Sequence, residues 1–170
     1  KDLLYEGHKV VPYCPRCETA LSSHEVALGY KDVSEPAITV EFALKDHPHR
    51  KFLAWTTTPW TLPGNTGVMA KPEADYAKVS VSGQTLIMAK ELVQPTMEKI
   101  GVVDYHILAT LKGKELENVC YEHPLKDIFK FQKNLPNAHR VVLSDQFVTL
   151  DTGTGLVHTA PGHGAEDYKV

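Results

Sequence analysis

The chain has 170 residues, of which 42% are hydrophobic and 23% charged, as expected of one globular domain with its own core. Lys and Arg total 18 against 21 Asp and Glu, and the net charge of -3 excludes a general attraction to long stretches of nucleic-acid backbone. No apolar run approaches the ~20 residues of a membrane helix and no leader peptide is recognisable, so we expect a cytoplasmic chain without membrane contact, excised from a longer protein because it starts at Lys1.

Residues 1–36 are expected to form a strap that leads into the domain, with a plain linker as the alternative. Prolines and glycines interrupt the stretch, and no apolar period runs through it. Cys14 and Cys17 have the spacing of half a four-ligand zinc site, to which the positions of His8 and His24 add little support. We therefore expect no zinc in this chain, only an incomplete half-site. Three cysteines, an odd number, also fit a reducing compartment better than a disulfide framework.

Alternation of apolar and polar residues starts at Ile38 and continues to Leu44, which is the pattern of a half-buried strand. Short runs of similar character follow, and Ser82-Gly83-Gln84 has the composition of a hairpin turn. A helix is expected over 90–100, kinked or shortened by Pro95. The further strands are expected at 52–57, 66–70, 77–81, 85–89, 105–111, 119–121, 140–143, 147–150 and 155–159. This pattern predicts one α+β, mainly β domain over 37–170, a mixed β-barrel with a few peripheral helices.

The stretch WTTTPWTLPGN at 55–65 places three successive hydroxyls between two tryptophans. Such a run serves no ordinary packing purpose, so we interpret it as one wall of a site. In an extended chain, Thr56 and Thr58 project to one side and Thr57 to the other, so the three cannot all touch one ligand atom. The alternative is a run of high β propensity at a strand end.

The second wall is predicted at 153–168, where the sequence reads GTGLVHTAPGHGAEDY. Asp167 follows a glycine-rich loop and is expected at the start of a helix near Ala165, where stabilising the helix dipole is the alternative role for its charge. His158 ends an apolar strand and either lines the same pocket or is a hydrogen-bonded core histidine. His163 is either a polar contact or an exposed turn residue.

Together the two motifs resemble the editing domain inserted in class I isoleucyl-tRNA synthetases, often called connective polypeptide 1. The related valyl and leucyl enzymes are similar in layout but usually carry Arg where Thr58 stands, so the resemblance points to the isoleucine member. The stretches at 13–17 and 20–25 also look like that family, and the implied fold is the Val/Ile/Leu-tRNA synthetase editing-domain fold. One departure is Gly64, since the family more often has Ala or Ser before Asn65.

The resemblance implies a proofreading hydrolase that removes valine wrongly esterified to isoleucine tRNA, with hydrolysis of valyl-adenylate left open. A site that accepts isoleucine discriminates weakly against a substrate one methylene smaller, so a second pocket that admits only the smaller side chain multiplies the discrimination. The HIGH and KMSKS signatures of ATP handling do not occur in the sequence, so no ligase activity is expected from this chain alone. ATP and Mg²⁺ are thus implied for the parent enzyme only, and editing needs no cofactor.

An aminoacyl ester is already activated, so positioned water can cleave it without a protein nucleophile. By resemblance, Asp167 holds the α-ammonium group of the substrate, and His158 lines the side-chain pocket and refuses isoleucine. The threonines at 56–58 are implied to position the ribose hydroxyl, the ester and the water. The resemblance also implies that Asn65 holds the adenosine end. From its large apolar face, Trp60 is expected to shield the water or to stack on the terminal base. Gly162 lets substrate come close to the backbone, and His163 is a further polar contact.

The implied partners are the 3′ acceptor end of tRNA(Ile) carrying valine and the remainder of the parent synthetase, and the domain is expected to be a monomer. Core packing is the alternative for Trp60, and Trp55 is assigned to the core. Two other functions stay open. A module that only binds an acceptor end would need no role for Asp167. A zinc-ribbon interaction domain would rest on Cys14 and Cys17, whose partners in the family are expected beyond the end of this chain.

Overall fold

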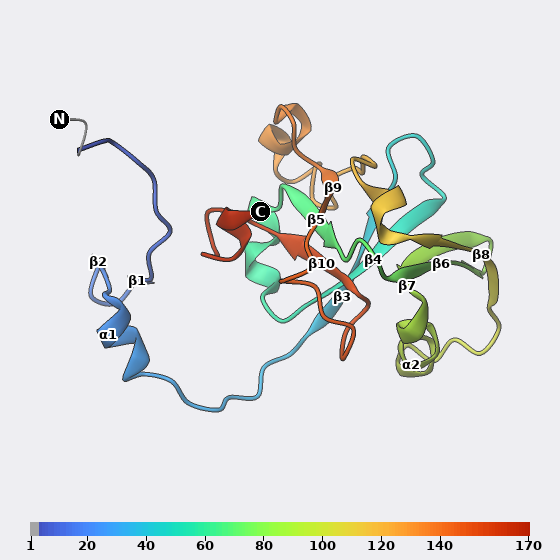
Figure 1. The fold of residues 1–170 in the computed structure, drawn as a ribbon, viewed down its shortest axis with the longest axis horizontal. Coiled ribbons are helices and arrows are strands. Elements are labelled where there is room, and N and C mark those ends of the chain that lie inside the picture. The colour runs from blue at the N-terminus through green and yellow to red at the C-terminus, as the bar shows by residue number, and fades with distance from the viewer. Residues whose placement is uncertain (1–3) are drawn as a thin grey trace.

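The computed structural model describes residues 4–170 and contains a five-stranded sheet as its largest element (Figure 1). Its strands lie in the order β3-β4-β7-β6-β8, and all neighbours are antiparallel except β4 and β7. The short connection between β6 and β7 is the hairpin that the sequence predicts around Gly83, whose φ is +80°. The bounds of these strands are β3 Ile38–Ala43, β4 Arg50–Thr56, β6 Asp75–Val81, β7 Gln84–Ala89 and β8 His106–Lys112.

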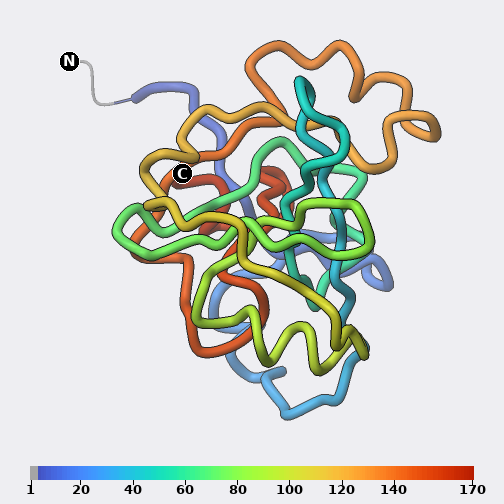
Figure 2. Tube along the Cα trace, turned by 90° about the vertical axis from the view of Figure 1, so that its right-hand side faces the viewer, coloured from blue at the N-terminus to red at the C-terminus, as the bar shows by residue number. Residues whose placement is uncertain are grey.

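A second sheet has three strands in the order β10-β5-β9, with β5 (Gly67–Ala70) in the centre. Strand β9 (Arg140–Leu143) runs parallel to β5, and β10 (Leu156–Thr159) runs antiparallel to it. The last part of the chain, drawn in red, thus returns to lie beside the green segment of β5 (Figure 1, Figure 2). This return brings the two sequence motifs to the same end of the domain.

The main core lies between the two sheets. Its fully buried members include Phe42 and Phe52 from the larger sheet and Val68, Val141 and Leu156 from the smaller one. A second cluster packs the outer face of the larger sheet against helix α2, through residues that include Leu53, Val79, Met88 and Met97. Burial of these apolar side chains, at about 25 cal/mol per Å² removed from water, is the main force that holds both layers together.

Helix α2 (Val93–Lys99) follows a 3-10 turn, η2 (Lys90–Leu92), and together they cover the helix expected at 90–100. Pro95 lies in the first turn of α2, where a backbone N–H has no partner within the helix, so it shortens the helix without breaking it. The described helices include none that is long and apolar enough to cross a bilayer.

The expectation of a mainly β domain with few helices is confirmed, but a closed barrel is not found in residues 4–170. The expected strands at 119–121 and 147–150 do not form. Residues Cys120 and Tyr121 make only isolated bridges, one from Cys120 to Arg140 of the smaller sheet and one from Tyr121 to Leu44, just beyond β3. Backbone hydrogen bonds link residues 118–122 to His139 and Val141 on one side and to Ala43 and Lys45 on the other, but they form isolated bridges and not a continuous ladder.

Residues 4–37 extend away from the body (Figure 1), and most of their side chains are exposed. They contain a small hairpin, β1 (Tyr13–Cys14) with β2 (Thr19–Ala20), and a short helix, α1 (Ser23–Ala27). The helix begins with a capping box between Ser22 and Glu25, a signal that the sequence contained and that we did not use. Tyr168 of the body donates a hydrogen bond to the His8 carbonyl at 3.2 Å. The division at residue 36 stays a prediction.

Removing one buried hydroxyl tests how firmly the layers are joined. The Tyr76 hydroxyl donates to the Gly155 carbonyl at 2.6 Å and accepts from the Lys71 amide at 2.9 Å, and the side chain is fully buried. We predict that Tyr76→Phe lowers the free energy of unfolding by about 1–3 kcal/mol, because two backbone groups lose their partner. Urea denaturation measures this change. Tyr30→Phe, at an exposed tyrosine, is the control and should leave the midpoint unchanged.

Candidate active site

The two sequence motifs meet at a hollow of about 210 Å³. One side is formed by the end of β4 and the residues after it, and the other by β10 and the C-terminal turn. The side chains that line the hollow include Trp55, Thr56, Thr57, Thr58, His158 and Asp167. Residues far apart in the sequence thus converge on one small space, as the two-wall interpretation predicts.

The threonines occupy the point where β4 ends and a 3-10 helix, η1 (Pro59–Gly64), begins. Thr56 Oγ1 accepts a hydrogen bond from the Thr58 amide at 3.1 Å and lies 3.3 Å from Thr58 Oγ1. Thr57 lies between them and is exposed. The predicted division, with Thr56 and Thr58 on one side, is therefore confirmed.

Thr61 joins this group, although the sequence analysis did not select it. Its hydroxyl donates to the Thr58 carbonyl at 2.8 Å and lies 3.4 Å from Thr58 Oγ1 and 3.0 Å from His158 Nε2. Side chains at positions i and i+3 of a 3-10 helix lie above one another, which places Thr61 over Thr58. Pro59, which favours the start of a helix, was the signal in the sequence that could have revealed this pairing.

His158 is a buried, neutral histidine in the wall of the hollow. Because the Thr61 hydroxyl uses its single proton on the Thr58 carbonyl, His158 Nε2 must donate its proton to Thr61. The other ring nitrogen, Nδ1, is buried and has no hydrogen-bond partner within residues 4–170. Burial lowers the pKa of His158 most, the nearby charge of Asp167 raises it, and His163 lowers it further. The side chain is both hydrogen-bonded in the core and part of the pocket, so the two alternatives coincide.

Asp167 is held over the end of β10 by a backbone amide. Its Oδ2 atom accepts a hydrogen bond from the Ala160 N–H at 3.0 Å, and no hydrogen bond within residues 4–170 uses Oδ1. Gly164 permits this arrangement, because a Cβ atom there would lie 3.1 Å from Oδ2. The helix expected from Ala165 is wrong, since only a three-residue 3-10 turn, η5 (Asp167–Lys169), is formed. A turn this short has little dipole, so the dipole role for Asp167 loses its basis.

Asn65 lies behind the hollow and not on its surface. Its side chain is fully buried, its Oδ1 atom accepts from the Tyr121 hydroxyl at 2.6 Å, and its Nδ2 donates to the Gly67 and Thr159 carbonyls at 2.8 and 3.3 Å. Every polar atom of the amide is thus used inside the protein. The predicted contact between Asn65 and adenosine does not fit this geometry, so we correct its role to support of the loop and of the junction between β5 and β10.

The glycine that departs from the family pattern also has a structural reason. A Cβ atom on Gly64 would lie 2.6 Å from Cε1 of His163, so the imidazole ring covers this position. His163 itself is exposed, while at Gly162 a Cβ would meet nothing within 4 Å. The loop is consequently closed by a ring packed on a glycine, and Gly162 leaves open space beside it.

The hollow is lined by Trp55 and not by Trp60, whereas the sequence predicts Trp60 at the site and Trp55 in the core. Trp55, which we assigned to the core, is only half-buried and lines the hollow, and its Nε1 atom is buried with no hydrogen-bond partner within residues 4–170. Trp60 is 61% exposed and does not line the hollow. An exposed indole on η1 agrees with a role in contacting a ligand that approaches from solvent and excludes core packing.

The Cys14–Cys17 pair closes a tight turn on the N-terminal hairpin. The Cys17 N–H donates a hydrogen bond to Cys14 Sγ at 3.4 Å, and this bond is the main reason that the pKa of the Cys14 thiol is lowered. The hydrogen bond between the two thiols is the main cause that raises the pKa of Cys17. Within residues 4–170 there is no group of three or more His, Cys, Asp or Glu side chains that could hold a metal ion. The two cysteines alone do not make up a zinc ligand set, and their occupancy stays a prediction.

The sequence matches the family described as tRNA synthetases class I (I, L, M and V) over residues 1–132. Relatives include the isoleucine–tRNA ligases of Saccharolobus solfataricus, 46% identical, and Bacillus thuringiensis, 48% identical, both over all 170 residues. The chain spans 17% and 16%, respectively, of the lengths of these two relatives.

Solved structures resemble this fold as well. A structure described as GlLeuRS-CP1 has a TM-score of 0.64 at 18% identity and covers 79% of this chain and 58% of that one. The editing domain of the P. knowlesi cytosolic leucyl-tRNA synthetase has a TM-score of 0.61 at 14% identity and covers 82% and 62%. The fold is therefore that of these editing domains. With the match over residues 1–132, it follows that the chain belongs to the class I tRNA synthetases (I, L, M and V).

Proposed function

We propose that this chain is the proofreading hydrolase domain of an isoleucine–tRNA ligase and removes valine esterified to tRNA(Ile). The observation that carries the proposal is the convergence of the threonine hydroxyls, His158 and Asp167 on one small hollow. The high identity to isoleucine–tRNA ligases and the fold of leucyl-tRNA synthetase editing domains support it.

Asp167 is the group that binds the α-ammonium of the substrate. A carboxylate next to a neutral histidine gives the hollow one negative charge, which favours a cationic group. The hydrogen bond from the Ala160 N–H fixes Oδ2, so the carboxylate is oriented before the substrate arrives and little ordering free energy is lost on binding. Oδ1 is then the atom that receives the ammonium.

The threonines place the ester and the attacking water. Thr58 is fixed by Thr56 and Thr61 on either side, and the exposed Thr57 is free to contact the ribose hydroxyl. Water that is held at the correct angle and distance attacks an activated ester without a covalent intermediate, and orientation of this kind accounts for much of a hydrolytic rate. His158 is neutral and its Nε2–H is committed to Thr61, so it shapes the pocket for the amino-acid side chain and does not transfer protons.

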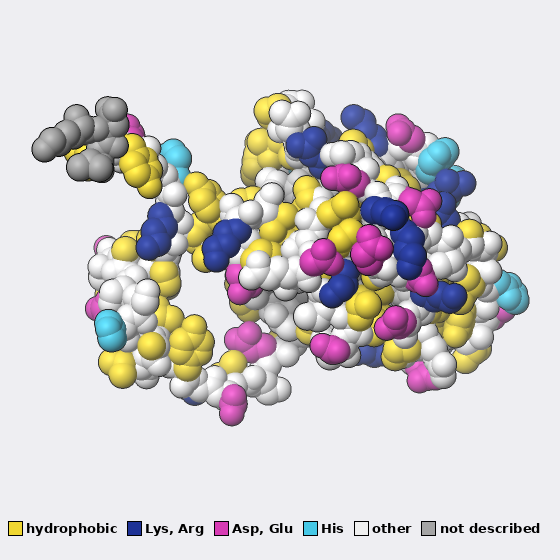
Figure 3. Space-filling view, in the orientation of Figure 1, with side chains coloured by type: hydrophobic (Ala, Val, Ile, Leu, Met, Phe, Trp, Pro, Cys, Tyr) yellow, Lys and Arg dark blue, Asp and Glu magenta, His cyan; other side chains and the backbone are white. Residues whose placement is uncertain are grey.

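The acceptor end of the tRNA reaches this site while the tRNA is bound to the parent synthetase. Positive and negative side chains are interspersed on the face shown in Figure 3, and the net charge is -3, so the chain offers little general attraction to the phosphates of a whole tRNA. The rest of the ligase supplies the affinity for tRNA. ATP and Mg²⁺ are needed only for its synthetic reaction. The domain acts as a monomer in the cytoplasm, and editing uses no cofactor.

Replacement of Asp167 tests the ammonium contact. Asp167→Asn can still accept the Ala160 amide but lacks the charge, so deacylation of valyl-tRNA(Ile) should fall about tenfold to 100-fold, the cost of one charge-assisted hydrogen bond. Single-turnover hydrolysis of radiolabelled valyl-tRNA(Ile) gives the rate. Glu166→Gln, one position away and exposed, is the matched control and should retain full activity. Unchanged hydrolysis in Asp167→Asn would refute the ammonium contact, whereas binding of tRNA without any hydrolysis by the parent chain would favour a module that only binds the acceptor end.

Truncation of His158 tests the size gate. His158→Ala enlarges the side-chain pocket, so we expect hydrolysis of correctly charged isoleucyl-tRNA(Ile) to rise at least tenfold relative to valyl-tRNA(Ile), on the scale of one to two methylene groups in a pocket. The ratio of the two deacylation rates is the measurement. His47→Ala, at an exposed histidine that does not line the hollow, should leave the ratio unchanged. An unaltered ratio in His158→Ala would contradict the gate.

Acidification should weaken the fold through His158. Its folded pKa is lowered below the ordinary value of 6.5, so the neutral form stabilises the protein above that pH. This stabilisation is lost as the pH falls from 6.5 through the lowered folded value. We predict that the free energy of unfolding decreases between pH 7 and pH 5, and that the decrease is smaller in His158→Gln. Because burial also lowers the pKa values of His123 and His139, part of the dependence remains in that variant. His24→Gln, at an exposed residue, should reproduce the parent curve.

A further inference from the structure

A group of polar residues contacts the segment 62–66, which follows the threonines in the chain. These side chains come from the connection between β8 and β9, far from both motifs in the sequence, and we call them the polar clamp. Its members are Tyr121, His123, Gln132 and His139. Tyr121, His123 and Gln132 are at most 2% exposed.

Each member of the clamp bonds to a different residue of the segment 62–66. The Tyr121 hydroxyl reaches Asn65 Oδ1 at 2.6 Å, and the His139 backbone amide reaches the Thr66 carbonyl at 2.6 Å. His123 Nε2 lies 3.0 Å from the Leu62 carbonyl, and Gln132 Nε2 donates to the Pro63 carbonyl at 2.5 Å. Four positions at the end of η1 and just after it are therefore held from one side.

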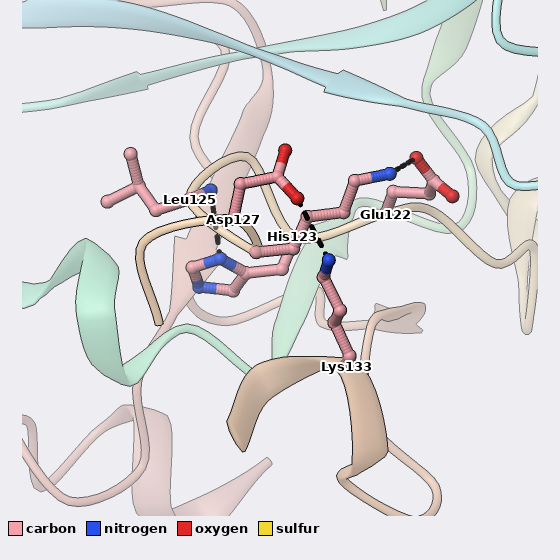
Figure 4. Close-up of polar contacts among 6 residues, drawn as sticks. Glu122, His123, Leu125, Asp127 and Lys133 are labelled. Atoms are coloured by element: carbon pink, nitrogen blue, oxygen red, sulfur yellow. Dashed lines mark hydrogen bonds and ion pairs between the residues drawn. The ribbon is translucent and has the colours of Figure 1, made fainter. Parts of the chain in front are cut away.

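The donors of the clamp are themselves oriented by other bonds. Figure 4 shows that His123 Nδ1 accepts from the Leu125 amide, at 3.0 Å, so the proton of the neutral ring must be on Nε2, which faces Leu62. Gln132 Oε1 lies 2.9 Å from His139 Nε2, and this contact directs the Nε2 atom of Gln132 toward the Pro63 carbonyl, to which it donates. Tyr121 packs edge-on against Phe42 with ring centroids 5.1 Å apart. His123 and Gln132 are thus each oriented by a second hydrogen-bond partner, and Tyr121 by packing on Phe42.

The clamp holds the far end of η1, a short 3-10 helix that contains two residues without a backbone N–H, Pro59 and Pro63. Within η1 and its cap, the Thr61 amide donates to Thr58 and the Asn65 amide to Leu62, both at 3.0 Å, and 3-10 hydrogen bonds have poorer geometry than α-helical ones. The same short helix carries the hydroxyl of Thr61, which links Thr58 to His158. The position of these hydroxyls therefore depends on what holds the far end of η1.

We propose that the polar clamp positions the editing hydroxyls, so that Tyr121 and Gln132 are positioning residues for the hydrolytic step. The inference rests on the proposed function for its catalytic consequence, but the mechanical part does not. A site must be held within about half an ångström of its productive geometry by the side chains behind it. Loss of one clamp bond thus loosens Thr58 and Thr61 without touching a substrate.

Hydrogen exchange tests the mechanical part in the 170-residue chain. Tyr121→Phe and Gln132→Met each remove clamp bonds with little change in volume. We expect the Thr61 and Asn65 amides to exchange about tenfold faster in both variants, relative to amides in β6 and β7, because local opening costs less free energy. Tyr76→Phe is the matched control, since it removes a buried tyrosine hydroxyl that does not contact segment 62–66; because Tyr76 is itself part of β6, the quantity compared for this variant is the exchange rate of the Thr61 and Asn65 amides, which should stay at the parent value. Equal ratios in the parent and both clamp variants would overturn the proposal.

Kinetics test the catalytic part. In both clamp variants, kcat for valyl-tRNA(Ile) should fall about tenfold while KM stays within about twofold, because the loss is one of orientation in the reacting complex. A purely structural role predicts a lower melting temperature with unchanged kcat for the folded fraction, and that result would also refute the clamp. If the parent chain shows no deacylation, the proposed function fails, and the exchange rates alone decide whether the clamp holds the segment.

Discussion

The antiparallel pairing of β5 with β10 is the contact on which the hollow depends. It places Thr159 opposite Gly67 and His158 opposite Val68, so that the end of the first motif lies close to the middle of the second. Gly67 is required at this junction, since a Cβ there would lie 2.8 Å from Thr159 Cγ2. Asn65 then joins both strands through the carbonyls of Gly67 and Thr159. A one-residue shift of this register would turn His158 away from Thr61.

Two titratable side chains line the hollow, His158 and Asp167, and only Asp167 carries a charge. His158 is pulled in opposite directions, by burial toward the neutral form and by Asp167 toward the charged form, and burial dominates. If the histidine were protonated, it would pair with the carboxylate and compete with a cationic ligand. Burial of the His158 ring therefore leaves the Asp167 carboxylate free to bind a cationic group. This effect of burial is separate from its effect on the stability of the fold.

The regular parts of this domain could be predicted from local patterns. Alternation from Ile38 onward, the turn at Gly83 and the period-two division of Thr56 and Thr58 each follow from neighbouring residues, and each is found. What failed depended on contacts between distant residues. The burial of Asn65 is decided by its bond to Tyr121, and the exposure of Trp55 to the hollow by the return of the C-terminal segment. In the described part of the chain, Cys120 and Tyr121 form isolated bridges where a closed barrel needs a continuous ladder. The pairing of Thr61 with His158 was missed for the same reason, because 97 positions separate them.

The placement of the two tryptophans has a practical consequence. The chain contains only these two, and both belong to the first motif, one lining the hollow and the other exposed on η1. Fluorescence excited at the red edge of the indole absorption band, where the seven tyrosines do not absorb, therefore originates from residues in or next to the first motif. The tryptophan emission spectrum of the unlabelled protein therefore reports on ligand occupancy and solvent access around Trp55 and Trp60, without a contribution from other parts of the domain.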